Sequence, residues 1–153
     1  MGAASSIKTY IYLSYPKLDA NIEELKNTLI NLNYNVLDSS LTGEYIKEKN
    51  VNELNNIVSE YLLTIPLQII CISPETTKSI IQTLEMNNTP VESNIIYLML
   101  DNNYTPTTNF ELNTLIRNKK NTPIWFPFYD TNTIFETKNK IITILMNKYN
   151  NDI

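Results

Sequence analysis

Hydroxyl and carboxylate side chains are the groups in this sequence that could do chemistry, because the other common catalytic types are absent or single. The 153 residues contain no histidine and one cysteine, Cys71. Zinc sites, cysteine–histidine dyads and Ser-His-Asp triads are therefore excluded. A lone cysteine also excludes an intramolecular disulfide, which favours a reducing compartment. No metal site is expected, and any catalysis must use carboxylates whose positions depend on the fold.

Composition narrows the class of protein further. The length fits one domain, and 42% apolar residues are too many for a disordered tail. A net charge of -4, from 12 Lys+Arg and 16 Asp+Glu, argues against a non-specific nucleic-acid binder. No apolar run reaches the roughly 18 residues that a membrane span needs, and no secretory signal precedes the first strand.

Strand and helix patterns alternate along the chain. β-branched, aromatic or continuously apolar runs predict five strands, at 7–14, 34–37, 67–73, 95–100 and 123–128. Helical spacing of apolar residues predicts five helices: one capped by Asp19 with apolar positions 22, 25, 29 and 32, and others at 51–62, from Ser79 onward, at 109–117 and at 133–149. The stretch 38–43 has turn composition.

Two helix starts carry a capping-box pattern. Ser79 and Gln82 form one, in which the serine oxygen takes a first-turn amide and Gln82 reaches back to the serine amide. Thr133 and Glu136 form the other. These boxes predict where the third and last helices begin.

The βαβαβαβαβα order predicts a parallel sheet with helices on both faces, in a flavodoxin-like three-layer α/β domain with strand order 2-1-3-4-5. Ligands of such sheets bind where the strand order reverses, here between the first and third strands. Ser14, Tyr15, Pro16 and Lys17 lie on one side of that point and residues 73–79 on the other. Because 14–17 contain no glycine, dinucleotide folds and phosphate-loop NTPases are excluded. A response regulator needs an acidic cluster after the first strand, and a flavodoxin needs a Ser/Thr/Gly-rich phosphate loop at the first turn. The sequence has neither, so both classes are excluded.

Several short motifs follow one another along nearly the whole chain. The strand 10–15 ends in Ser-Tyr, and the loop 37–43 ends in Gly43. Ser-Pro at 73–74 is followed by Ser79 and, six residues later, by Glu85. In type and order these motifs resemble those of the Toll/interleukin receptor (TIR) domain family. The most specific match is the one from Ser73 to Glu85, in which Ile81 and Gln82 stand at the usual Trp and Cys positions. The pair at 125–126 is similar to the Phe-Trp box, in inverted order.

The resemblance implies a site residue, Glu85, which in TIR enzymes binds the nicotinamide-side ribose of NAD and is needed to break the glycosidic bond. A carboxylate there would stabilise the oxocarbenium-like cation left when nicotinamide departs. With a helix starting at Ser79, Glu85 lies in its second turn, near the carboxyl edge of the sheet. The alternative is a solvated helix residue.

The remaining candidate substrate-binding residues each have a structural alternative. Tyr15 could stack on a base or pack on the core, and Lys17 could meet phosphate or be an ordinary surface lysine. Gly43 indicates a special backbone angle or a close approach, or an ordinary turn. The other candidates are Ser14 beside Tyr15, and Ser73 and Ser79, which are explained first as caps.

The amino terminus fits the N-myristoylation pattern, with Gly2 as the lipidated residue, or is a flexible leader. We therefore divide the chain into a lipidation signal or leader at 1–6 and a single TIR-like domain at 7–150. One myristoyl chain binds bilayers only marginally, with K of about 10⁴ M⁻¹. The expected location is cytoplasmic, with membrane association if Gly2 is acylated.

The leading functional hypothesis is TIR-type signalling by homo- or hetero-association with other TIR domains, with or without NAD nucleosidase activity through Glu85. NAD would be a substrate, and no cofactor is expected. The alternatives are a non-catalytic adaptor or decoy that interferes with host TIR signalling through the loop around Gly43, and a myristoylated structural protein that keeps only the fold.

Overall fold

Five parallel strands form one sheet in the order β2-β1-β3-β4-β5, as the sequence predicted. The computed structural model describes residues 9–47, 51–102, 110–116 and 123–149. The predicted strands are all present, and their ends differ from the predicted ones by at most three residues. They are β1 (Tyr10–Ser14), β2 (Asn35–Asp38), β3 (Leu67–Ile72), β4 (Asn94–Met99) and β5 (Ile124–Pro127).

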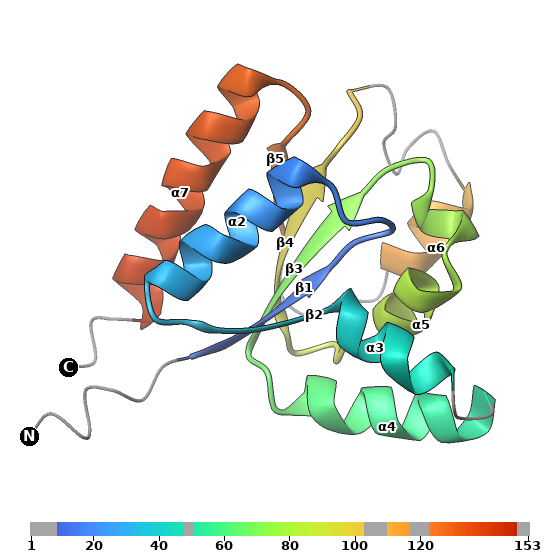
Figure 1. Cartoon of the computed structure of the whole chain (residues 1–153). Helices are drawn as coiled ribbons and strands as arrows, with labels where there is room; N and C mark the ends of the chain where they lie inside the picture. The colour runs from blue at the N-terminus through green and yellow to red at the C-terminus, as the bar shows by residue number, and fades with distance from the viewer. Residues whose placement is uncertain (1–8, 48–50, 103–109, 117–122, 150–153) are drawn as a thin grey trace, which may run out of the picture.

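Helices cover both faces of this sheet (Figure 1). The helices are α2 (Ala20–Asn31), α3 (Ser39–Ile46), α4 (Val51–Leu63), α5 (Ile80–Asn88), α6 (Phe110–Ile116) and α7 (Thr131–Tyr149), with a short 3-10 turn, η1 (Thr76–Lys78), before α5. α2 and α7 pack on one face, and α4, α5 and α6 on the other. The result is the three-layer, flavodoxin-like arrangement.

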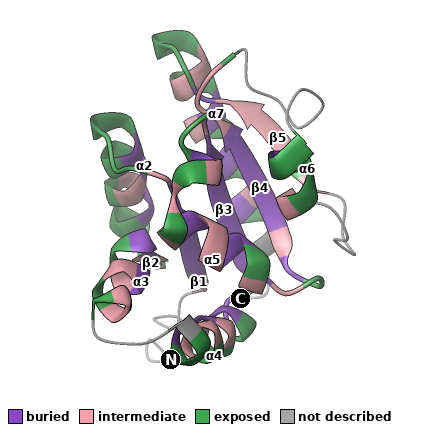
Figure 2. Ribbon diagram, turned by 90° about the vertical axis from the view of Figure 1, so that its right-hand side faces the viewer, coloured by how far each residue is buried: buried purple, intermediate pink, exposed green. Residues whose placement is uncertain are grey.

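The central strand β3 is buried along its whole length (Figure 2). Ile69 and Cys71 belong to the core cluster under α2 and α7, whereas Ile70 and Ile72 belong to the cluster under α5 and α6. This alternation explains why the strand reads as one continuous apolar run. In the register of the sheet Ser14 lies beside Ile70, which places Ser14 at the carboxyl edge next to the strand-order reversal.

The prediction of a turn at 38–43 is wrong, because α3 begins at Ser39. The Asp38 side chain accepts a hydrogen bond from the Ser40 amide and so caps this helix. Aspartate and serine favour both turns and helix N-termini, so composition alone did not separate the two. Gly43 does not adopt a positive φ. A Cβ atom at Gly43 would lie 3.3 Å from Cδ1 of Ile81, so the close approach predicted for this glycine is present.

The predicted helix caps are confirmed in two of three places. Asp19 accepts from the Ile22 amide at 2.8 Å, and Ser79 accepts from the Gln82 amide at 3.0 Å. The return half of the Ser79 box is wrong, because the Gln82 amide nitrogen instead donates to the carbonyl oxygen of Cys71 at 2.6 Å. The last helix starts earlier than predicted, at Thr131, and its cap is Asp130, which accepts from the Thr133 amide at 2.8 Å.

Within the described ranges, no helix is long and apolar enough to cross a bilayer. Gly2 and the rest of the predicted leader lie outside those ranges.

Candidate functional site

Glu85 lies in the second turn of α5, and its side chain is 1% exposed. α5 follows β3 after the short η1 turn, so its first two turns stand at the carboxyl edge of the sheet. The predicted position of Glu85 is therefore confirmed, whereas the alternative of a solvated helix residue is wrong. A glutamate is rarely buried to this extent unless its oxygens are paired.

Two of the hydroxyls that bind Glu85 come from β1. Ser14 donates to Oε1 at 2.7 Å, and Tyr12 donates to Oε2 in a short hydrogen bond. Residues two apart on a strand point to the same face of the sheet, so Tyr12 and Ser14 both face α5.

The other two hydroxyls come from α3. Ser39 donates to Oε1 at 2.8 Å, and Thr42 donates to Oε2 at 3.0 Å. Residues three apart on a helix share a face, which brings both hydroxyls onto the buried side of α3. Each carboxylate oxygen thus accepts two hydroxyl hydrogen bonds. We call these four hydroxyls, of Tyr12, Ser14, Ser39 and Thr42, the hydroxyl cage.

A tyrosine of α4 extends the hydroxyl cage toward the surface. The half-buried Tyr61 shares a short hydrogen bond with Thr42, and its ring stacks on Tyr12 with centroids 5.7 Å apart. Tyr45 of α3 lies on the same aromatic stack, 6.4 Å from Tyr61. The buried carboxylate is therefore linked to a partly exposed phenol through hydroxyl groups.

Burial raises the pKa of Glu85 to about 6, although the hydrogen bonds from the hydroxyl cage act in the opposite direction. Burial also raises the pKa of Tyr12 and of Tyr61, so that both phenols are neutral beside the carboxylate. No residue in the described ranges forms an ion pair with Glu85. The site is a carboxylate that is bound by neutral donors only.

A second buried carboxylate, Asp38, lies at the N-terminus of α3. It accepts hydrogen bonds from Lys26 of α2 at 2.7 Å, from the Tyr15 hydroxyl at 3.1 Å and from Ser40. Burial acts to raise the pKa of Asp38, but the hydrogen bonds from Lys26 and Ser40 outweigh it and the pKa is lowered. Asp38 is therefore ionised and compensated by a lysine.

The structure brings together some of the predicted site residues and separates others. Ser14 contacts Glu85 directly, and the buried Tyr15 lies beside it, with its amide donating to the Ser39 hydroxyl at 3.0 Å. Gly43 is on the same helix as Ser39, on the side that approaches α5. Lys17 is exposed and forms no hydrogen bond or ion pair with the described residues of this site. Ser73 and Ser79 bind local backbone amides, as their alternative role as caps predicted.

Sequence reasoning missed three members of the hydroxyl cage: Tyr12, Ser39 and Thr42. Tyr12 could have been found from its spacing, because it precedes Ser14 by two residues in a predicted strand. Ser39 and Thr42 could not be paired while 38–43 was treated as a turn, since their shared face exists only in a helix.

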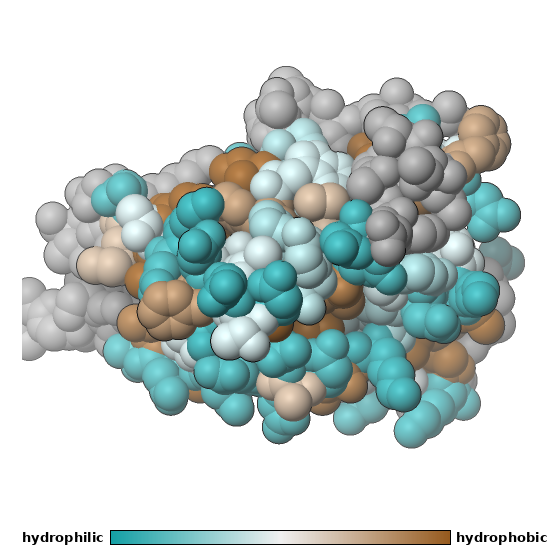
Figure 3. All heavy atoms as spheres, turned by 90° about the horizontal axis from the view of Figure 1, so that it is seen from above, coloured by the Kyte–Doolittle hydropathy of each residue, from teal (hydrophilic) through white to brown (hydrophobic). Residues whose placement is uncertain are grey.

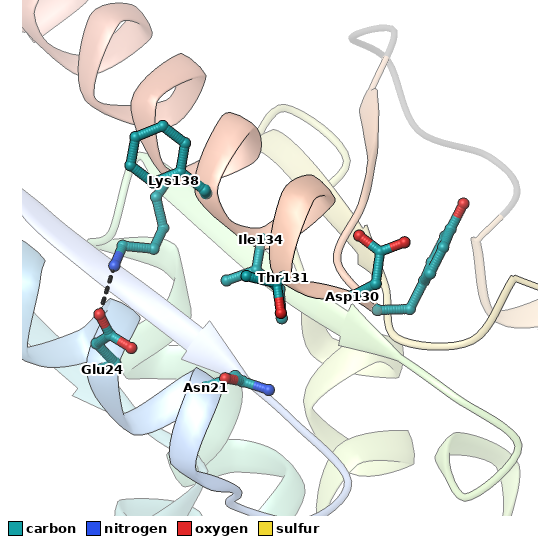
Figure 4. Close-up of a pocket in the computed structure, with 8 residues that line it drawn as sticks. Asn21, Glu24, Asp130, Thr131, Ile134 and Lys138 are labelled. Carbon is teal, nitrogen blue, oxygen red and sulfur yellow. Dashed lines mark hydrogen bonds and ion pairs between the residues drawn. The ribbon is translucent and has the colours of Figure 1, made fainter.

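Glu85 lines none of the three surface grooves that we describe. The first, of about 360 Å³, lies between α2 and α7, where Glu24 and Lys138 pair at 2.7 Å near Asn21, Asp130 and Ile134 (Figure 4). The second, of about 420 Å³, lies between α5 and α6, and the third, of about 340 Å³, runs along α7 beside Phe126. Seen from the carboxyl edge of the strands, the described surface is mostly hydrophilic or intermediate, with small hydrophobic patches (Figure 3).

The chain matches no protein-family model, and the search of curated proteins gave no match.

Proposed function

We propose that this chain is a TIR-type association domain, which acts by binding other TIR-like domains, including further copies of itself. The confirmed strand order and the TIR-like motifs at 10–15, 73–79 and Glu85 support this proposal. Acylation of Gly2 would add a weak membrane attachment, which self-association would reinforce because several acyl chains would then act together.

The observation that carries the proposal is an exposed apolar surface on the outer side of α5 and α6. Ile80 is 77% exposed and Phe110 is 80% exposed. The two helices are in contact, and the groove between them is lined by Thr77, Thr83, Asn87, Phe110, Glu111, Thr114 and Leu115. Phe110 and Leu115 are the apolar residues of this groove, and Ile80 lies outside it at the N-terminus of α5. Exposed large apolar side chains beside a groove are typical of protein-binding surfaces.

The geometry of Glu85 favours association over catalysis. Both carboxylate oxygens are fully engaged by the hydroxyl cage, so a ribose hydroxyl could bind only by displacing one of its members. Ser39 and Thr42 are parts of α3, so a movement of this helix would take both hydroxyls away from the carboxylate. As long as α3 stays in place, Glu85 has a structural role: it connects α5, which carries it, to β1 and α3.

Sedimentation velocity of the full chain over a wide concentration range tests the association. We expect the average mass of the wild type to rise with concentration, and Ile80→Ser and Phe110→Ser to weaken that rise. Phe135→Ser is the matched control, because Phe135 is a similarly exposed aromatic residue on α7. A wild type that stays monomeric throughout, or a Phe135→Ser effect as large as that of Phe110→Ser, would contradict the proposal for self-association through this surface.

NAD cleavage is the second candidate, and a specific observation favours it. Glu85 and Ser14 lie together at the strand-order reversal, where sheets of this kind bind ligands. A carboxylate with a pKa near 6 at such a position is a recognised mark of a functional site. With α3 displaced, Glu85 could bind ribose hydroxyls and stabilise the cation that forms as nicotinamide departs.

The test is NAD consumption by concentrated protein, with wild type beside Glu85→Ala and Glu85→Gln. Consumption by the wild type and by neither variant would establish a nucleosidase. If no protein consumes NAD, at high concentration or on vesicles, the catalytic candidate is removed and association remains.

A further inference from the structure

Glu85 is a buried titratable group that association does not use, and it connects α3 to the rest of the domain. Two of the four hydroxyls in its cage belong to β1 and two belong to α3. α3 is also held by its cap, by the Tyr15 amide on Ser39, by hydrogen bonds from Thr42 to Tyr12 and Tyr61, and by the close contact between Gly43 and Ile81, but Glu85 is the ionisable group that both of its buried hydroxyls bind. A change in the charge of Glu85 must therefore act on α3.

The groups that face Glu85 provide no positive charge to compensate it. β1 contributes the phenol of Tyr12, the residue after β1 contributes that of Tyr15, and α4 contributes that of Tyr61, all with a pKa raised chiefly by burial. The end of β2 contributes Asp38, a second negative charge, and Lys26 of α2 is committed to that aspartate at 2.7 Å. On α3 itself, Tyr45 stacks on Tyr61, and Glu44 is exposed. An ionised Glu85 is thus a desolvated charge without a cation.

The arrangement in the structure, with α3 bound to Glu85, can satisfy the hydrogen bonds of this side chain in either protonation state; we call it the closed form. Besides Oε2 of Glu85 and the hydroxyls of Thr42 and Tyr61, the Tyr12 hydroxyl has the carbonyl oxygen of Asp38 within reach, at 3.0 Å. When Glu85 is ionised, Tyr12 donates to it. When Glu85 is protonated, its proton can be donated to the Tyr12 oxygen, while Tyr12 turns to donate to the carbonyl of Asp38. The proton can bind without loss of a hydrogen bond.

We propose that α3 is a pH-dependent latch, held closed over the carboxyl edge of the sheet when Glu85 carries a proton and released more readily when Glu85 is ionised. Release exposes the carboxylate to water, which hydrates the ionised form better than neutral hydroxyls do. It also uncovers Ser14 at the strand-order reversal. The latch goes beyond the proposed association and does not depend on it.

Proton linkage fixes the direction of the effect. The pKa of Glu85 is about 6 in the closed form, against 4.5 for an unperturbed glutamate. Between these values the closed form binds more protons than the open form does, so a rise in pH favours opening. A difference from 4.5 to about 6 increases the opening constant of α3 by up to roughly 30-fold as the pH rises through this window.

Hydrogen–deuterium exchange of the α3 amides in the full chain, measured from pH 4.5 to 8 and corrected for the intrinsic rate, tests the latch. In the wild type we expect the α3 opening constant to rise by roughly 15-fold over this range, because the open form is already half ionised at pH 4.5, and to level off above pH 7, while the α7 amides do not follow that rise. An opening constant that is flat, or that falls as the pH rises, would overturn the proposal.

Two glutamate variants identify the titrating group. Glu85→Gln keeps the size and hydrogen-bonding capacity of the side chain without a titration, so its α3 opening constant should stay flat near the low-pH level of the wild type. Glu44→Gln removes an exposed carboxylate from α3 itself and should keep the wild-type pH profile. The same slope in Glu85→Gln as in the wild type would show that another group titrates, and would reject the latch.

Tyr12→Phe keeps the proposal testable if Glu85→Gln does not fold, which circular dichroism would show. This change removes one donor to the ionised carboxylate, so the pKa of Glu85 should rise and the midpoint of the exchange profile should move to higher pH. An unchanged midpoint would contradict the role of the hydroxyl cage. Sedimentation of these variants reports on association separately, so failure of the latch and failure of the proposed function are distinguishable.

Discussion

The two buried carboxylates beside α3, Asp38 and Glu85, are almost equally inaccessible but have opposite electrostatic surroundings. Asp38 is 4% exposed and Glu85 is 1% exposed. Asp38 has a lysine partner, Lys26, and its pKa is lowered. Glu85 has only neutral hydroxyl partners, and its pKa is raised to about 6. Burial is common to both sites, so the presence or absence of a cation decides the direction of the shift.

This difference divides the attachment of α3 into two parts. Asp38 holds the N-terminus of the helix through a charge that is stable near neutral pH. Glu85 holds the buried face of the helix through a carboxyl group that binds or loses its proton near pH 6. The N-terminus of α3 should therefore remain attached under conditions in which its buried face loosens.

Removal of the Glu85 side chain should have the largest effect on stability. Glu85→Ala leaves four buried hydroxyls without their common acceptor and opens a cavity, which we expect to lower the free energy of unfolding by about 3–5 kcal/mol. Urea unfolding at pH 7 measures this change.

Glu85→Gln is the matched control for that prediction. Its amide oxygen can accept two hydroxyl hydrogen bonds and its amide group can donate to the oxygens of the other two, so the loss should be smaller than about 1.5 kcal/mol. If Gln and Ala were equally destabilising, the negative charge itself would be essential to the fold, and the contrast with Asp38 would fail.

Lys26→Met makes the surroundings of Asp38 resemble those of Glu85, because it removes the cation and keeps the aliphatic stem. We expect it to lower the free energy of unfolding by about 1–3 kcal/mol at pH 7 and to raise the pKa of Asp38. In the wild type, the lowered pKa of Asp38 stabilises the fold above pH 3.8, and this contribution is lost as the pH falls through the folded-state pKa. The variant should lack that acid-sensitive component in its stability profile.

The control for Lys26→Met is Lys138→Met. Lys138 pairs with Glu24 at the same distance, 2.7 Å, but Glu24 is 62% exposed. An exposed pair of this kind contributes at most about 1 kcal/mol. If the two lysine changes lowered the free energy of unfolding equally, the burial of Asp38 would not strengthen the contribution of its ion pair to stability.

Most of the fold was predictable because its signals are local and repeated. The continuous apolar run of β3 and the helical spacing in α2 are each set by a few adjacent residues. Alternation of strands and helices then restricts the connections, and the predicted order 2-1-3-4-5 is confirmed. Helix α3 was missed because Asp38 and Ser39, which begin it, are equally suited to a turn.

The candidate site was predictable in place but not in composition. Its location followed from the sheet order, and the position of Glu85 followed from the Ser79 cap, which is confirmed. The depth of burial of Glu85 was not predictable, because it depends on hydroxyls from β1 and α3 that meet only after folding. Lys26, the ion-pair partner of Asp38, is likewise on a different element, α2, and no sequence pattern predicts that these two residues meet.

The smallest expected effect separates packing of α3 from its hydrogen bonds. Gly43→Ala should gain about 0.5–1 kcal/mol from helix propensity, but its Cβ would lie 3.3 Å from Cδ1 of Ile81, so the net change in unfolding free energy should be under about 0.5 kcal/mol. In an Ile81→Val background, which lacks that methyl group, the same change should stabilise by the full propensity gain. A double-mutant cycle in urea measures this coupling. If Gly43→Ala stabilised both backgrounds equally, the close approach of α3 to α5 would not limit its packing, and the carboxylates alone would determine how tightly α3 is held.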